Sequence, residues 1–180
     1  MQKLSLALIA ALAVAGCSSA PKLTSKGHRL NEIVNDHFEA SLKLDPLFAT
    51  SIGDHRYDNM LTIQIGEKER AQSAALTDDS LQKIRTLGCD ALNEQDTLTC
   101  NTFISDLEAI QELEKDDLSY LMPFNQFDSF FSNFAELASG ASYVTFDNET
   151  DYNNFLARLA IVPAYIDTMI DNMKIGMKKQ

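Results

Sequence analysis

The sequence is poor in cysteine, which can cross-link a chain, and in glycine and proline, which interrupt regular secondary structure. Three Cys are too few for a disulfide-rich scaffold or a Cys-rich zinc fold. Seven Gly and four Pro, beside many Leu, Ile and Phe, exclude a collagen-like repeat and a disordered chain. The 180 residues are therefore predicted to form one globular domain behind a short leader.

Positive charge is also scarce, because 15 Lys and Arg stand against 26 Asp and Glu, a formal net charge of −11. Loss of residues 1–16 would remove one Lys and leave 14 basic against 26 acidic residues, or −12. Phosphate backbones repel such a chain, which argues against nucleic acid as a partner.

The first residues resemble an export signal. Lys3 precedes an apolar run at 4–15, which has the length of a signal-peptide core and is too short to span a bilayer. The run ends in Val-Ala-Gly-Cys at 14–17, which resembles a bacterial lipobox. We therefore expect residues 1–16 to be a lipoprotein signal peptide and Cys17 to be acylated. The alternative is an ordinary secreted protein in which Cys17 is incidental.

These features predict an exported protein on the periplasmic face of the cell envelope, held to the membrane by acyl chains. Ser18, in place of an Asp, resembles lipoproteins that are sent to the outer membrane. Residues 17–27 would be the lipidated Cys and its tether, and 28–180 the helical domain. In an oxidising compartment Cys89 and Cys100 could form a disulfide, and two buried free thiols are the alternative.

Apolar residues recur at helical spacing through the body, so the predicted fold class is all-α, an irregular array of amphipathic helices. Pro46 separates the first helix from a short second one, because proline restricts the residue before it. Thr-Asp-Asp at 77–79 could break the third helix in two. Helices are expected at 27–44, 46–51, 67–87 and from an Asn93 cap to 115, the last with Cys100, Phe103, Leu107 and Ile110 facing inward.

The C-terminal third is first aromatic and then amphipathic. Phenylalanines at 124–134 predict one or two helical turns that end at Ser139 and Gly140. From about Thr150 to Met173 or beyond, one long helix is expected, kinked at Pro163 because proline cannot donate to the carbonyl one turn earlier. Its apolar stripe consists of Tyr152, Phe155, Leu156, Leu159, Ile166, Ile170, Met173 and Met177.

No catalytic or metal-binding motif is visible. His28, His37 and His55 do not form H-E-x-x-H, the motif of many zinc peptidases, and His37 is predicted to be a core or boundary residue. There is no G-x-S-x-G elbow and no glycine-rich phosphate loop, although residue types alone leave a Ser-His-Asp hydrolase open. Acids at 147–151 begin like a calcium loop but lack its Gly and final Glu, so they are predicted to cap the last helix.

Two stretches are candidate sites. The loop 53–59 could line a cleft or dock a partner, because loops often carry function, and a turn held by local hydrogen bonds is the alternative. The aromatic face at 124–134 is either ordinary core or a surface that docks or lines a cleft. The loop residues that carry the first prediction are Asp54, His55, Tyr57 and Asp58.

Three stretches also look like family signatures. They are Asp-Pro-Leu-Phe-Ala-Thr-Ser-Ile-Gly-Asp-His-Arg-Tyr-Asp at 45–58, Tyr-Leu-Met-Pro-Phe-Asn-Gln at 120–126, and Tyr-Asn-Asn-Phe-Leu-Ala-Arg-Leu at 152–159, followed by Pro163 and Tyr165. Together and in this order they resemble the bacterial lipoprotein family catalogued as domain of unknown function 885. The resemblance covers about residues 28–177.

The resemblance implies longer, largely helical relatives that are similar to thimet-oligopeptidase-like zinc metallopeptidases, with H-E-x-x-H in a later region. We therefore expect an N-terminal part cut before that region and inactive alone, with zinc implied only for the full-length family. Expected partners are the membrane, the missing catalytic part and peptides. The alternative is a stand-alone periplasmic binding or adaptor lipoprotein, and a third hypothesis is a metal-independent hydrolase that uses Asp54 and Asp58.

Overall fold

The computed structural model describes residues 24–115, 118–124 and 129–179, and this part of the chain is helical with a single isolated bridge between Phe124 and Ser129. The predicted all-α class is confirmed. The elements in order are α1 (Ser25–Leu44), α2 (Pro46–Ser51), the short 3-10 helix η1 (His55–Tyr57), α3 (Glu67–Leu87), α4 (Glu94–Lys115), the 3-10 helix η2 (Ser119–Leu121), α5 (Phe130–Ala138), α6 (Glu149–Leu159) and α7 (Val162–Lys178).

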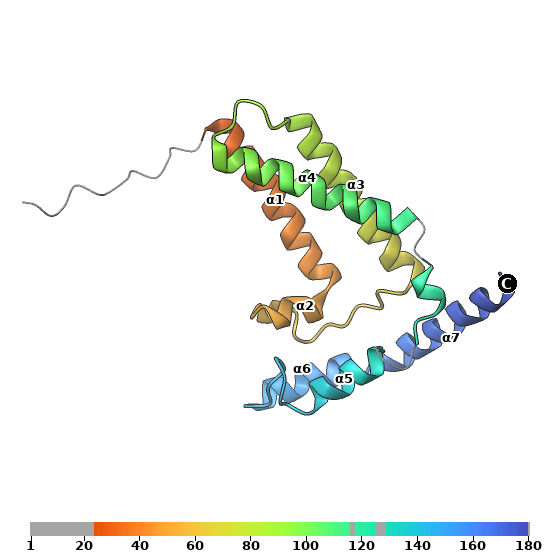
Figure 1. Ribbon diagram of the computed structural model, residues 1–180. Helices are drawn as coiled ribbons and strands as arrows, with labels where there is room; N and C mark the ends of the chain where they lie inside the picture. The colour runs from red at the N-terminus through yellow and green to blue at the C-terminus, as the bar shows by residue number, and fades with distance from the viewer. Residues whose placement is uncertain (1–23, 116–117, 125–128, 180) are drawn as a thin grey trace, which may run out of the picture.

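The helices form two layers, as Figure 1 shows. The first layer consists of α1, α3 and α4, which pack side by side. The second layer consists of α5, α6 and α7, and α2 with η1 connects the two. Each of the three long helices contributes to one aliphatic core in the first layer, which is made by Leu30, Ile33, Leu81, Ile84, Cys100 and Leu107.

Helix α1 begins earlier than the predicted tether allows. The hydroxyl of Thr24 accepts a hydrogen bond from the backbone N–H of Gly27 (3.1 Å) and caps the helix, which therefore starts at Ser25. Lys26 also leaves the tether, because its Nζ donates to the Asp90 carbonyl (2.6 Å) in the loop between α3 and α4. Helix α1 therefore includes residues 25–27, which the sequence analysis placed at the end of the tether, and residues 1–23 lie outside the described part.

Helix α3 is not broken at Thr77-Asp78-Asp79, as the sequence allowed. Thr77 and Ser80 are buried on the face that meets the neighbouring helices, and Asp78 accepts a hydrogen bond from Gln111 of α4 (2.8 Å). These contacts offset the weak helix propensity of Thr and Asp. The helix ends at Gly88, whose φ of 68° is a conformation that glycine adopts readily.

Helix α4 opens as predicted, because the side-chain oxygen of Asn93 accepts a hydrogen bond from the N–H of Asp96 (2.8 Å). Cys100 and Leu107 are fully buried. Ile110 is not in the core, since 39 % of it is exposed and it borders a groove between the layers. The C-terminal end of α4 therefore borders this groove, and its apolar side chain at 110 does not join the core.

Aromatic stacking builds the core of the second layer. Ser129 caps α5, and Phe130 then lies flat against Tyr165 of α7, with ring centroids 3.8 Å apart. Phe134 stacks on Phe155 of α6 with centroids 5.2 Å apart. The aromatic face is therefore core at these positions, whereas Phe124 is exposed and position 127 lies outside the described residues.

The last segment forms two helices, not one kinked helix. Helix α6 ends at Leu159, two residues form a turn, and α7 restarts at Val162. The turn tightens where the N–H of Ile161 donates to the Arg158 carbonyl (3.1 Å). Pro163 lies in the first turn of α7, where its missing N–H costs nothing, so the proline begins a helix here.

The predicted apolar stripe of this segment is only partly buried. Helix α6 turns Phe155 and Arg158 inward, and α7 turns Tyr165, Met169 and Asn172 inward. The other side of both helices faces solvent, and this exposed apolar face consists of Tyr152, Leu156, Leu159, Ile170 and Met177. None of the described helices is long and apolar enough to cross a membrane.

Candidate functional site

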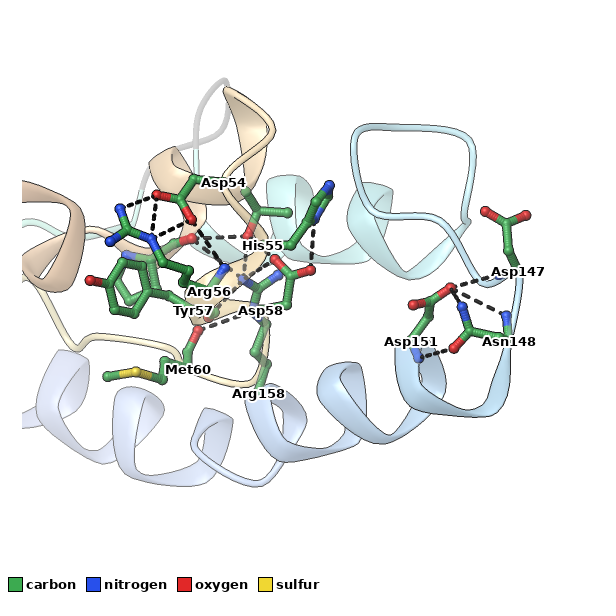
Figure 2. Close-up of polar contacts among 12 residues, drawn as sticks. Asp54, His55, Arg56, Tyr57, Asp58, Met60, Asp147, Asn148, Asp151 and Arg158 are labelled. Atoms are coloured by element: carbon green, nitrogen blue, oxygen red, sulfur yellow. Dashed lines mark hydrogen bonds and ion pairs between the residues drawn. The ribbon is translucent and has the colours of Figure 1, made fainter.

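The loop after α2 is folded by its own acidic side chains, as Figure 2 shows. Asp54 caps η1 by accepting a hydrogen bond from the N–H of Arg56 (3.1 Å), and its carboxylate also binds the Arg56 guanidinium (2.6 Å). Arg56 reaches back to Glu39 of α1 as well (2.8 Å). The hydrogen bonds from Arg56 lower the pKa of Asp54, and the same carboxylates raise the pKa of Arg56.

His55 and Asp58 form a pair on the other side of this loop. The Nδ1 atom of His55 lies 2.9 Å from Oδ2 of Asp58. The other carboxylate oxygen of Asp58 accepts a hydrogen bond from the Thr50 hydroxyl (2.7 Å). The Asp58 side chain is 19 % exposed and that of His55 68 %, so the carboxylate is held from below and the imidazole faces solvent.

Arg158 of α6 holds the loop in place from beneath (Figure 2). It is 1 % exposed and donates to the Thr50 hydroxyl (2.5 Å) and the Met60 carbonyl (3.0 Å). Asp58 is its carboxylate partner at 3.7 Å. Burial lowers the pKa of Arg158, and the charge of Asp58 works against this shift.

The structure thus brings together the predicted loop residues, but through contacts that fold the loop. Asp54 faces Arg56, Asp58 faces Thr50 and Arg158, and the Tyr57 carbonyl accepts from Arg158 (3.3 Å). A small cavity of about 50 Å³ borders His55 and Asp58. Sequence reasoning missed the central role of Arg158, although an arginine between Phe155 and Leu159 on an apolar stripe was a usable signal.

A much larger hollow lies between the two layers. This groove has a volume of about 860 Å³, inside the range of roughly 300–1,000 Å³ that is usual for small-ligand sites. It is bordered by the C-terminal half of α1, the first half of α3, the end of α4, η2 and α7. Its chemically distinctive lining residues are His37, Glu67, Arg70, Glu114, Tyr120 and Asn172.

Arg70 is the unusual residue of the groove. Its guanidinium carbon lies 3.5 Å from the ring centroid of Tyr120, which is close stacking of a cation on an aromatic face. Its Nε is buried and has no hydrogen-bond partner in the described part of the chain. Tyr120 entered the sequence analysis only as part of a family signature and Arg70 did not enter it, because the two residues are 50 positions apart and only folding joins them.

His37 borders the same groove, but its side chain already has partners within the first layer. Its Nδ1 lies 2.9 Å from the Ser80 hydroxyl of α3, and its ring contacts Phe103 of α4 edge-on, with centroids 5.2 Å apart. Burial lowers the pKa of His37. It is a boundary residue of the first layer, as predicted.

Comparison with known families decides the relationship. The family described as bacterial protein of unknown function (DUF885) matches residues 46–180, which is most of the chain. The chain belongs to the DUF885 family. No curated protein and no solved structure matches it. The match includes the loop after α2, Arg70 and Arg158, so the features above lie inside the DUF885 region.

The histidines of this DUF885 chain lie in different surroundings. His28 is exposed on α1, His37 lies against Ser80, and His55 lies against Asp58. Within residues 24–115, 118–124 and 129–179 no three His, Cys, Asp or Glu side chains gather as metal ligands would.

The predicted cap at 147–151 is formed by Asn148 and one of the three acids, Asp151, at the start of α6 (Figure 2). Asn148 accepts from the N–H of Asp151 (3.2 Å), and Asp151 accepts in return from the N–H of Asn148 (3.2 Å). Asp151 also accepts from the N–H of Asp147 (2.9 Å). The local hydrogen bonds of Asp151 account for this stretch without a calcium ion.

The cysteines of the DUF885 chain fall into two groups. Cys89 and Cys100 form a disulfide in the structure, which joins the loop after α3 to the first turns of α4. Cys100 is fully buried at the centre of the first-layer core. Cys17, the predicted lipidation site, lies outside the described residues, and its acylation stays a prediction.

Proposed function

We propose that this DUF885 chain is an exported, lipid-anchored protein whose helical body holds peptides for a zinc metallopeptidase-like hydrolase without cleaving them itself. The observation that carries the proposal is the groove of about 860 Å³ inside the family region. It has the size of a ligand site and is lined by polar side chains, yet the 180 residues contain no H-E-x-x-H motif.

The proposed location is supported by the first residues. An apolar run of signal-peptide length followed by Val-Ala-Gly-Cys supports cleavage before Cys17 and acylation there. Two or more acyl chains anchor a protein stably, whereas one binds only marginally. The body would then stand on the periplasmic face of the envelope, at the outer membrane according to Ser18.

The catalytic residues are proposed to come from a partner segment. Among the described residues no three carboxylate, imidazole or thiol side chains gather as metal ligands would, so we propose that the zinc implied by the family resemblance is held elsewhere. The exposed apolar face of α6 and α7 favours such a partner over a stand-alone adaptor, because a large apolar surface is costly to leave in water.

A labelling experiment tests the anchor. The full chain is produced in a bacterium supplied with labelled palmitate, beside a Cys17→Ser variant. The wild-type chain is expected to carry the label and to sediment with membranes, and the variant to do neither. Equal labelling of the two would refute lipidation at Cys17.

A second experiment tests whether the chain alone binds zinc and cleaves peptides. The purified full chain is measured for bound zinc by atomic emission and for cleavage of a mixed pool of fluorogenic peptides. We expect neither stoichiometric zinc nor cleavage, and reproducible metal-dependent hydrolysis would contradict the proposal. Sequencing the coding DNA beyond codon 180 shows whether an H-E-x-x-H segment follows.

The adaptor alternative makes a different prediction for the same sample. A self-sufficient adaptor unfolds cooperatively, stays monodisperse and binds little of the dye ANS, which reports exposed apolar surface. Strong ANS binding that is lost after Leu156→Gln and Leu159→Gln on the exposed face would favour the proposal.

A further inference from the structure

The groove contains a guanidinium that carries a buried donor. The buried Nε of Arg70 has no hydrogen-bond partner among the described residues, and the guanidinium carbon lies 3.5 Å from the ring centroid of Tyr120. By contrast Arg29, Arg56, Arg85 and Arg158 each lie within 4 Å of a carboxylate. Among the described arginines, Arg70 therefore stands apart.

A buried guanidinium donor of this kind calls for an explanation. A buried donor without an acceptor is destabilising, and native structures contain few of them. The Nε of Arg70 is such a donor. A planar ligand oxyanion in the groove would accept from the guanidinium N–H groups in the two-pronged geometry that arginine favours.

Tyr120 prepares Arg70 for this role. The ring of Tyr120 covers one face of the guanidinium and restricts its movement. Less side-chain freedom is then lost when a ligand binds. The ring itself is fixed on η2, which packs closely on α7, because a Cβ added at Gly176 would lie 3.1 Å from the Leu121 carbonyl oxygen.

The other charges in the groove restrict the ligand further. Asp45, Glu67, Glu69 and Glu114 border the same hollow, and burial disfavours the charged form of His37. A dianionic phosphate would meet more repulsion than attraction there. A zwitterion suits the pattern better, with a carboxylate on Arg70 and an ammonium group toward the acidic side chains.

We infer that the groove binds short zwitterionic peptides, with Arg70 on its Tyr120 platform as the anchor for a ligand carboxylate. A volume of about 860 Å³ accommodates a peptide of a few residues. This assignment deepens the proposed function by naming the ligand class of the same groove, but it concerns binding alone. It can therefore fail or succeed independently of lipidation and of any catalytic partner.

Peptide fluorescence provides the test, since the chain itself contains no tryptophan. The probe is the tripeptide Lys-Ala-Trp, titrated with the purified full chain. The free acid is expected to bind at least tenfold more tightly than its C-terminal amide, because the amide removes the carboxylate that Arg70 would hold. Equal affinities of acid and amide would overturn the inference without any protein variant.

Protein variants then locate the anchor. Arg70→Gln is expected to weaken binding of the acid about 10- to 100-fold and to leave the weak binding of the amide unchanged. Arg70→Lys should lose part of this affinity, since an ammonium group keeps the positive charge but lacks the paired N–H donors of the guanidinium. The matched control is Arg85→Gln on the same helix, whose ion pair with Glu108 lies outside the groove. Loss of binding in the control as large as in Arg70→Gln would overturn the assignment.

Two further ligands distinguish the source and the class of the anion. The amide of Lys-Glu-Trp carries its carboxylate on a side chain, and Arg70-dependent binding of it extends the site from C-terminal to side-chain carboxylates. Inorganic phosphate is the competitor. If phosphate displaces Lys-Ala-Trp at or below the peptide's own dissociation constant, the site is an anion site of another kind and the peptide assignment is wrong.

Discussion

The two layers of the molecule are stabilised in different ways. The first layer uses three helices of about 20 residues, an aliphatic core and a disulfide between Cys89 and Cys100. The second layer uses shorter helices, stacked aromatic rings and a buried arginine. One layer thus depends on non-directional apolar contacts, and the other depends on contacts with defined geometry.

The difference follows from helix length. A long amphipathic helix buries a continuous stripe and needs few special contacts, as α1 does with Leu30 and Ile33. A helix of 9 or 11 residues, such as α5 or α6, is marginal alone and needs strong tertiary contacts. Arg158 supplies such contacts by binding carbonyl and hydroxyl oxygens of α2 and the following loop.

The sharpest way to break the second layer is Arg158→Met. The variant removes the buried positive charge that lies beside Asp58. It also leaves the carbonyl of Met60 and other acceptors without a donor. We expect a loss of about 3–5 kcal/mol in the free energy of unfolding, measured by urea denaturation. The control is Arg56→Gln on the same loop, whose exposed ion pairs should cost far less. Similar losses in the two variants would show that Arg158 does not hold the loop.

The corresponding change in the first layer is removal of the disulfide. Replacing Cys89 and Cys100 together by alanine frees a loop with a sequence separation of 11 residues, which should cost about 3 kcal/mol on the chain-entropy model. Amide hydrogen exchange should show the loss in α3 and α4 more than in α5 and α6. A uniform loss over both layers would mean that they unfold as one unit.

A smaller change tests the stacked rings. Phe130→Leu keeps an apolar side chain but removes the flat contact with Tyr165 and the stacking on Phe134. A loss of about 1 kcal/mol is expected from thermal unfolding followed by circular dichroism. Phe38→Leu on the exposed side of α1 is the control and should change little. If both variants lose the same amount, ring geometry contributes nothing special to the second layer.

The smallest predicted effect is a pH dependence at His37. Burial lowers the pKa of His37 in the folded state, so folding favours the neutral imidazole. Its contribution is complete above the unfolded pKa of about 6.5 and decreases as the pH falls below that value. Between pH 7.5 and 5.5 the wild-type Tm should therefore fall more than that of His37→Gln. Parallel curves would remove His37 as the cause.

Much of the helix content could be predicted because its signals are local. Thr24, Asp45, Asn93 and Asn148 each accept a backbone hydrogen bond within three residues, so the caps do not depend on the rest of the fold. For the loop after α2, a turn held by local hydrogen bonds was one of the two hypotheses that the sequence left open. Pro163 was misjudged, because a proline can kink a helix or begin one, and the choice depends on how the two halves pack.

Burial and partnership could not be predicted in the same way. The stripe on α6 and α7 has helical spacing, yet Leu156 faces solvent and Arg158 faces the core. Helical spacing shows which residues share a face, but not which face meets a neighbour. Loop residues from Thr50 to Met60 gather on Arg158 from about a hundred positions away.

The sequence by itself determined the helical class, most helix ends, the family and the absence of an H-E-x-x-H motif, since these depend on neighbouring residues or on their order. Tertiary structure decided that Arg158 is buried and holds the loop after α2, that Ile110 borders a groove, and that Arg70 stacks on Tyr120. Those facts depend on how helices that are distant in the chain approach one another. Burial and charge pairing are properties of that approach, and no local pattern encodes them.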